Sequence, residues 1–150
     1  MSAVPDGCQA ELERLLAVTG ASRTTLRVQA GDGMYPVVGE ARDEGINTLV
    51  GSEIDIRSAA TFHALDRDRE LLVQDDLSRA DPPPPAELIE LYGARAQMLA
   101  PLERDGRLVG VISVHESKGP RAWTDDDRSE LLAAAELIAA ELGVRSGASR

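Results

Sequence analysis

The chain has 150 residues, of which 43% are hydrophobic and 28% are charged, a composition typical of one folded domain. Its formal net charge of −10 argues against binding to nucleic acid or to an anionic membrane surface, because both partners need a basic face. No apolar run approaches the roughly 20 residues that cross a bilayer, no signal-peptide pattern is visible, and the single cysteine, Cys8, excludes an internal disulfide. We therefore expect a cytoplasmic protein.

The first third of the chain is predicted to form a helix and a hairpin, followed by an irregular segment. Asp6 is a candidate N-cap for the helix and Gly20 lies just past its end, and its leucines fall on one face. Alternating polarity indicates the first strand. In chain order, the expected elements are a helix over 6–19, strands over 23–29 and 34–40, and a loop over 42–57 with brief extended pieces.

The middle of the chain is predicted to hold only short elements. Ser58 is a candidate cap for a helix that runs to Leu65, and Gly93 ends a second short helix. Four consecutive prolines fit neither a helix interior nor a central strand, so they indicate a stiff loop. In chain order, we expect a helix over 58–65, a strand over 71–73, the proline loop over 82–85 and a helix over 86–92.

The last part of the chain carries the clearest patterns. Two extended runs within 95–115 flank Asp105-Gly106, a strong hairpin signal. Thr124 and Asp127 form a capping box for a final helix, which Trp123 is expected to anchor. These elements predict one α+β domain: an antiparallel sheet with the two terminal helices packed together on one face. We expect its core to span about 8–143, with 144–150 as a disordered tail.

Three stretches of the sequence resemble GAF domains. The run GARAQMLAPLERDGRLVGVISVH at 93–115 resembles the second half of that family, and VQDD at 73–76 is similar to its middle strand and turn. The run GPRAWTDDD at 119–127, with the last helix, is similar to GAF domains of phytochromes and cyanobacteriochromes. The resemblance implies an antiparallel GAF/PAS-like sheet with the terminal helices on one face. A ligand pocket is implied on the other face, roofed by loops and short helices.

Strand alternation selects the face of the sheet that forms the candidate site. Leu26 and Val28 suit the face beneath the terminal helices, so Thr25, Arg27 and Gln29 are expected on the opposite face. The resemblance places His115 in the pocket, with Ser113, Val111 and Val109 on its own strand and Arg95, Gln97 and Leu99 on the next.

The candidate ligand-binding residues are Arg27, Arg95, Gln97, Ser113 and His115 on this wall, with His63 of the short middle helix as a candidate roof contact. Such a wall is too polar to be buried empty, so one interpretation is a site for a small polar or anionic ligand, with arginine binding a carboxylate. The alternative is a partly open face whose arginines reach solvent or pair with acidic side chains. For His63, the alternative is a surface or core position.

The sequence carries no enzyme signature: it has no Gly-x-Ser-x-Gly elbow, no His-Glu-x-x-His and no phosphate loop. One branch of the resembling family, the free methionine-R-sulfoxide reductases, needs two cysteines in the pocket loops, whereas Cys8 is alone in another segment. The prolines at 82–85 occupy the region where cyanobacteriochromes carry Cys-His, and the cyclic-nucleotide signature is absent. We expect no catalysis, no metal and no bound cofactor.

The resulting hypothesis is a sensory or regulatory domain that binds a small, polar and anionic molecule. Since no effector domain follows it, its output is expected to pass through an unidentified partner protein. The terminal helices predict a homodimer that uses parts of 8–19 and 128–142. The rival hypothesis is an interaction module in which these helices form a dimer bundle and the pocket binds nothing.

Overall fold

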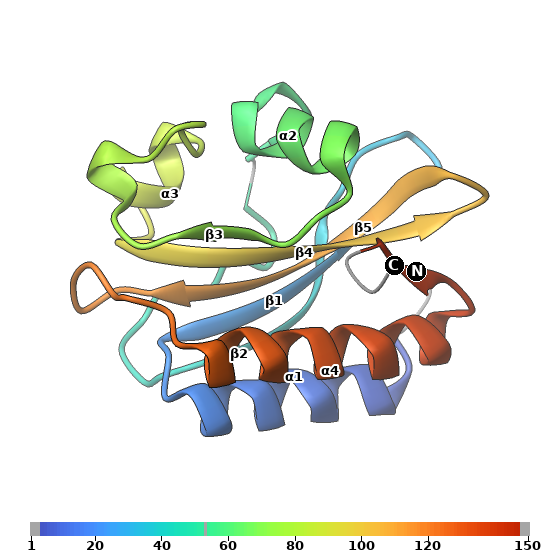
Figure 1. Ribbon diagram of the computed structural model, residues 1–150, viewed down its shortest axis with the longest axis horizontal. Coiled ribbons are helices and arrows are strands. Elements are labelled where there is room, and N and C mark those ends of the chain that lie inside the picture. The colour runs from blue at the N-terminus through green and yellow to red at the C-terminus, as the bar shows by residue number, and fades with distance from the viewer. Residues whose placement is uncertain (1–3, 53, 148–150) are drawn as a thin grey trace.

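An antiparallel sheet runs through the middle of the computed structural model, which describes residues 4–52 and 54–147 (Figure 1). Its strands are β1 (Arg23–Val28), β2 (Val37–Arg42), β3 (Leu72–Gln74), β4 (Ala96–Arg104), β5 (Arg107–Glu116) and β6 (Arg145–Ser146). They follow the order β2-β1-β5-β4-β3, with β6 also paired to β4. Each of these pairings is antiparallel, as predicted from the hairpins.

Helices cover both faces of the sheet. The α-helices in the described residues are α1 (Asp6–Thr19), α2 (Ala60–Asp68), α3 (Ala86–Glu90) and α4 (Asp125–Leu142). Figure 1 shows α1 and α4 side by side against one face, and the short α2 and α3 above the other. The main core lies between the long helices and the sheet, and its fully buried members include Leu12, Leu15, Leu26, Ile112, Leu131 and Ile138. The predicted α+β architecture is confirmed.

The helix ends follow local chemistry, with two corrections to the predicted caps. Thr124 and Asp127 form the predicted capping box of α4. At α1 the N-cap is Pro5, so Asp6 is the first helical residue and places its carboxylate near the positive end of the helix. Ser58 ends a 3₁₀ turn instead of capping α2, because Asp55 caps that preceding turn.

A β-bulge in β5 changes the alternation of side chains near the hairpin. Leu102 lies opposite Gly110 but Glu103 lies opposite Leu108, so Val109 is an extra residue in β5. Beyond the bulge, side chains point to the opposite face from the one that simple alternation predicts. Val109 packs against the core beneath the long helices, and Leu108 joins a cluster with Leu65, Leu99 and Val111 on the other face. The prediction that Val109 faces the pocket is therefore wrong.

The C-terminal segment contributes to the sheet. Arg145 and Ser146 form β6, which pairs with Leu102 and Glu103 of β4, and Ser146 is buried. The expectation of a disordered tail over 144–150 is thus wrong for these two residues, because β3 pairs only with residues 97–99 of β4 and leaves the edge at Leu102 and Glu103 open to β6. Residues 148–150 lie outside the described residues.

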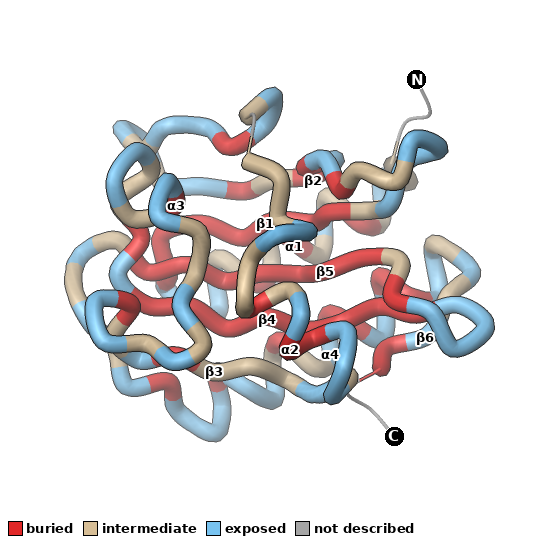
Figure 2. Tube along the Cα trace, turned by 90° about the horizontal axis from the view of Figure 1, so that it is seen from above, coloured by how far each residue is buried: buried red, intermediate tan, exposed pale blue. Residues whose placement is uncertain are grey.

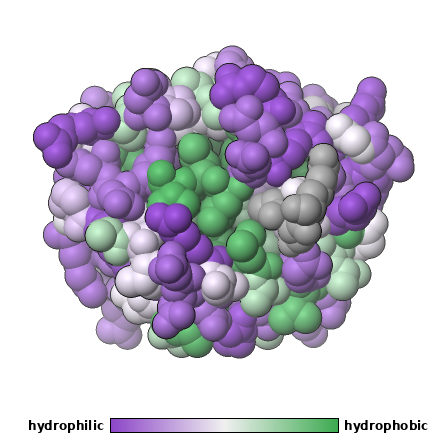
Figure 3. Space-filling model, in the orientation of Figure 1, coloured by the Kyte–Doolittle hydropathy of each residue, from purple (hydrophilic) through white to green (hydrophobic). Residues whose placement is uncertain are grey.

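Burial is concentrated in the central strands. Figure 2 shows β1, β4 and β5 as largely buried, surrounded by exposed loops. In Figure 3 apolar residues gather in the middle of the face, along the edge strand β3, where Leu72 and Val73 are half-buried. Within the described ranges, no helix is long and apolar enough to span a membrane.

Candidate functional site

A cavity of about 50 Å³ lies between the sheet and the layer of short helices and loops. Its floor is formed by Thr25, Arg27, Gln97, Leu99, Val111, Ser113 and His115 of β1, β4 and β5. Its roof is formed by Leu49, Ile54, Ile56, Thr61, Phe62, Leu65, Pro85 and Leu88. The floor is mainly polar and the roof mainly apolar, so the cavity suits a molecule with both kinds of surface.

The structure brings four of the six predicted site residues together on this floor. Arg27, Gln97, Ser113 and His115 come from three neighbouring strands, and each is less than 10% exposed. Their convergence follows from alternation, since each lies on the sheet face opposite the terminal helices. That they bind a ligand stays a prediction.

Two predicted site residues do not line the cavity. Arg95 is exposed; it lies one residue before β4, at the end of the sheet, and its Nη1 donates to the carbonyl of Ala94 at 3.1 Å. His63 is exposed on α2, where its Nε2 lies 2.9 Å from the carbonyl oxygen of Arg57. Gln29, which alternation also placed on this face, follows the end of β1 and is exposed. Alternation failed at these strand ends because the roof does not extend over them.

Arg27 is a buried cation on the cavity floor. Among the described residues its side chain makes one hydrogen bond, from Nη1 to the carbonyl of Tyr35 at 2.7 Å. No carboxylate of the described residues lies within 4 Å of its guanidinium nitrogens. Burial lowers its pKa to about 10, partly offset by the attraction of Asp55, so the group is charged at neutral pH. An anion in the cavity would supply a counter-charge within ion-pair distance.

Tyr35 holds this end of the cavity in place. Its hydroxyl donates to the carbonyl of Leu108 at 2.8 Å, and its ring meets the roof residue Phe62 edge-on at 5.1 Å between centroids. The carbonyl that receives Arg27 is therefore fixed to both the hairpin and the roof. Sequence reasoning gave Tyr35 no role; it was predicted to lie in the strand over 34–40, whereas β2 begins only at Val37.

His115 is a neutral histidine on the cavity floor. It is 4% exposed, and burial lowers its pKa to about 3, with the positive charges of Arg23 and Arg27 adding to the shift. Its Nδ1 is buried and has no hydrogen-bond partner in the described part of the chain. The neutral imidazole has one donor and one acceptor nitrogen, so it can bind either kind of group.

A chain of amides extends from the cavity floor to the proline loop. Gln97 donates from Nε2 to Oε1 of Gln74 at 2.8 Å, and Gln74 donates from Nε2 to the carbonyl of Pro82 at 2.7 Å. Gln97 is 1% exposed and lies opposite His115 in the ladder. Beside them the hydroxyls of Thr25 and Ser113 bond to each other. Gln74 was not predicted as part of the site, although it is the last residue of β3.

Arg23 is the charged residue that sequence reasoning missed. It is fully buried and lies opposite His115 in the ladder, and it shares its sheet face with Thr25 and Arg27. Its Nε is 3.4 Å from Oε2 of Glu40, and Nη2 donates to the carbonyl of Asn47 at 2.5 Å. Arg23 lies four residues before Arg27, so the alternation that placed Arg27 on this face also places Arg23 there. This signal was therefore present in the sequence.

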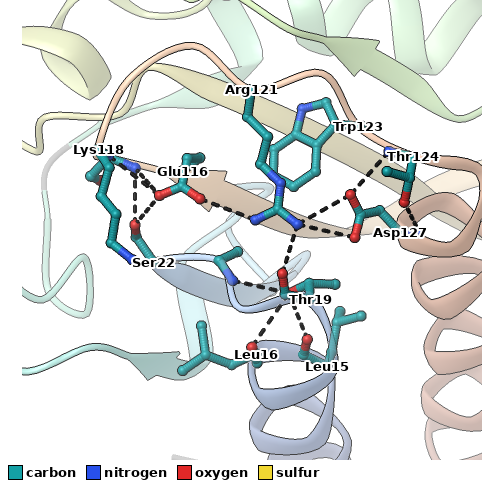
Figure 4. Close-up of polar contacts among 12 residues, drawn as sticks. Leu15, Leu16, Thr19, Ser22, Glu116, Lys118, Arg121, Trp123, Thr124 and Asp127 are labelled. Atoms are coloured by element: carbon teal, nitrogen blue, oxygen red, sulfur yellow. Dashed lines mark hydrogen bonds and ion pairs between the residues drawn. The ribbon is translucent and has the colours of Figure 1, made fainter.

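Outside the cavity, the turn before α4 connects the terminal helices to the sheet (Figure 4). Arg121 donates to Glu116 at 3.0 Å, to both carboxylate oxygens of Asp127 at 3.1 Å and to the carbonyl of Thr19 at 2.6 Å. Its guanidinium carbon lies 4.5 Å from the ring centroid of Trp123. These contacts connect α1, β5 and α4, and Trp123 anchors the last helix as predicted.

The comparisons with known proteins agree with this architecture. The family model of the GAF domain matches residues 5–142. A far-red cyanobacteriochrome photoreceptor has the same fold, with a TM-score of 0.79 and 14% identity over 94% of this chain and 86% of that one. No curated protein matches the sequence.

Two further solved structures share the fold. One is the far-red-absorbing dark state of JSC1_58120g3 with bound biliverdin IXa (TM-score 0.70, 16% identity, 87% of this chain and 84% of that one). The other is the chromophore-binding domain of the bacteriophytochrome RpBphP3 from R. palustris (TM-score 0.71, 22% identity, 95% and 56%). Identities this low show a likeness of fold alone. Because the family model covers nearly the whole chain, the chain belongs to the GAF domain family.

Proposed function

We propose that this GAF domain is a sensory or regulatory module that binds a small anionic molecule in the cavity and signals to a partner protein. The observation that carries the proposal is Arg27, a buried guanidinium on the cavity floor with no carboxylate of the described residues within ion-pair distance. A buried charge without a counter-charge is costly. A ligand carboxylate at this point would remove that cost.

The ligand is proposed to be much smaller than the biliverdin IXa that is bound in the structure of JSC1_58120g3. The cavity of about 50 Å³ has room for several waters or one small molecule, not for an extended tetrapyrrole. Cys8 is buried in the core between the long helices and the sheet, on the opposite face, so its thiol is not available for attachment in the cavity. Burial also raises the pKa of that thiol, which lowers its reactivity.

We propose a binding role and not a catalytic one. His115 is held neutral beside Ser113, but the Ser113 hydroxyl bonds to Thr25 and makes no hydrogen bond to His115 in the described residues. A serine nucleophile needs a base within hydrogen-bond reach.

The cytoplasmic location also stays a prediction.

A thermal-shift screen with carboxylates, phosphates and nucleotides tests the function, because a ligand that binds only the folded state raises the melting temperature. We expect small carboxylates to stabilise the wild-type protein. Arg27→Met should abolish that effect, whereas Arg79→Met, at a side chain 85% exposed, should keep it. Stabilisation of neither protein by any anion would contradict the proposal.

A second role, self-association, is favoured by the outer surface of the terminal helices. Val18 of α1 is 50% exposed and Leu137 of α4 is 51% exposed. Exposed large apolar side chains on both helices would be covered in a two-fold dimer of this bundle. If the cavity binds nothing, this surface would be the functional one, with the domain acting as an interaction module.

A further inference from the structure

The orientation of the Gln97 amide on the cavity floor is fixed by a backbone carbonyl. The carbonyl of Pro82 can only accept, so the group of Gln74 that faces it at 2.7 Å must be the donor Nε2. Oε1 of Gln74 therefore faces Gln97 and must receive Nε2 of that residue, at 2.8 Å. The remaining atom of Gln97, Oε1, is an acceptor, and no donor among the described residues bonds to it.

His115 supplies the complementary group beside this acceptor. The two residues are ladder partners on β4 and β5, both line the cavity and both are buried. His115 is neutral, and its Nδ1 lacks a partner in the residues that the structure describes. This end of the floor therefore offers an amide oxygen and, on the ladder partner of that residue, an imidazole nitrogen, both without a partner in the described residues. A buried polar atom is costly to leave unsatisfied.

A hydroxyl group satisfies both residues at once, because it donates one hydrogen bond and accepts others. It would donate to Oε1 of Gln97 and accept from the N–H of His115. A carboxylate here would place acceptor against acceptor at Gln97. An ammonium group would lie close to the buried guanidinium of Arg23, which is the ladder partner of His115 on its other side. A methyl group would leave both polar atoms unpaired.

The hydroxyl end and the anionic end of the cavity are separate. Arg27 lies opposite Val111, which is four residues from His115 along β5. At roughly 3.3 Å per residue, the backbone positions of Val111 and His115 are about 13 Å apart. Both side chains line the same cavity, so they approach a ligand from its two ends. Between them the ligand meets apolar groups, such as Leu99 of the floor and Phe62 of the roof.

From these three regions we infer that the ligand is a small hydroxy acid: a carboxylate at Arg27, an apolar body, and a hydroxyl at the far end that Gln97 and His115 bind. This inference rests on the proposed function, since it assumes that an anion binds at Arg27. It adds a second polar group to the ligand, the hydroxyl, and identifies Gln97 and His115 as the residues that bind it.

Calorimetry with matched pairs of acids tests the inference on the wild-type protein. The pairs are para-hydroxybenzoate with para-methylbenzoate, meta-hydroxybenzoate with meta-methylbenzoate, and gamma-hydroxybutyrate with pentanoate. Each pair exchanges only hydroxyl for methyl. We expect at least one hydroxy acid to bind tighter than its methyl partner by roughly tenfold or more, because the methyl leaves buried polar groups unpaired.

The variant Gln97→Leu should lose this preference for hydroxyl while keeping its affinity for the methyl acid. The wild-type series alone decides the question if that variant does not fold. Methyl acids that bind as tightly as their hydroxy partners would overturn the inference and leave the proposed function standing. If the screen finds no carboxylate that binds at all, the proposed function falls and the inference falls with it.

Discussion

Arg23 and His115 face each other across β1 and β5, and both are buried. A fixed positive charge opposite an imidazole adds to the effect of burial, so the pKa of His115 falls to about 3 in the folded protein. In the unfolded chain the pKa returns to about 6.5. Between these values the unfolded state binds the additional proton, so acidification favours unfolding.

We therefore expect the free energy of unfolding to fall as the pH decreases from about 6.5, and to continue falling until about pH 3. At about 1.36 kcal/mol per pH unit, His115 alone accounts for about 2 kcal/mol at pH 5. Urea unfolding at several pH values measures this. His115→Gln should be less sensitive to acid than the wild type, whereas His63→Gln, at an exposed histidine, should match the wild type. Equal acid sensitivity of the His115 variant and the wild type would show that His115 is not held neutral by the fold.

The affinity for a carboxylate should depend on Arg27. Replacing it by Met removes the buried charge but keeps an apolar side chain, and we expect a loss on the order of 1.5–3 kcal/mol, the contribution of a hydrogen bond to a charged group. Calorimetry with a carboxylate from the screen measures the loss. Arg79→Met is the control for the change in net charge, since Arg79 is exposed and does not line the cavity. Equal losses in the two variants would mean that the effect is bulk electrostatics.

Sequence patterns predicted the layers of the fold and most of the cavity floor, because both follow from rules that act over a few residues. Alternation along a strand places Arg27, and the hairpin signal at Asp105-Gly106 fixes β4 and β5. The same rules fail where a distant contact decides the outcome. Val109 changes face at a bulge, and Arg95 lies past the roof.

The roof and the second half of the polar network could not be predicted from the sequence. Gln74 joins the site only because β3 pairs with β4, and Pro82 only because the proline loop folds over Gln74. These contacts link segments without any periodic pattern between them. Arg23 is different, because alternation along β1 already indicates that it lies on the same face as Arg27. Only its contact with Glu40 could not be predicted without the structure.

Arg121 should be needed for stability and not for ligand binding. It does not line the cavity, and the structure places it where three elements meet, with Glu116 and Asp127 largely buried around it. Arg121→Met leaves these two carboxylates without their cation, and we expect about 2–3 kcal/mol less stability. Urea denaturation compares this variant with Arg79→Met, which should lose almost nothing. A small loss equal to that of the control would mean that the contacts of Figure 4 contribute little.

Self-association should depend on the apolar side chains that the terminal helices expose. A two-fold dimer of the helix bundle would bury Val18 and Leu137, so a carboxylate at either position would place a charge in the interface. Sedimentation at micromolar concentration should show a dimer for the wild type and a monomer for Val18→Glu and Leu137→Glu. Val50→Glu is the matched control, because Val50 is 53% exposed but lies in the loop after β2 and belongs to neither helix. A wild-type monomer would refute the dimer, and dissociation by all three variants would show that added negative charge, on a chain already at −10, is the cause.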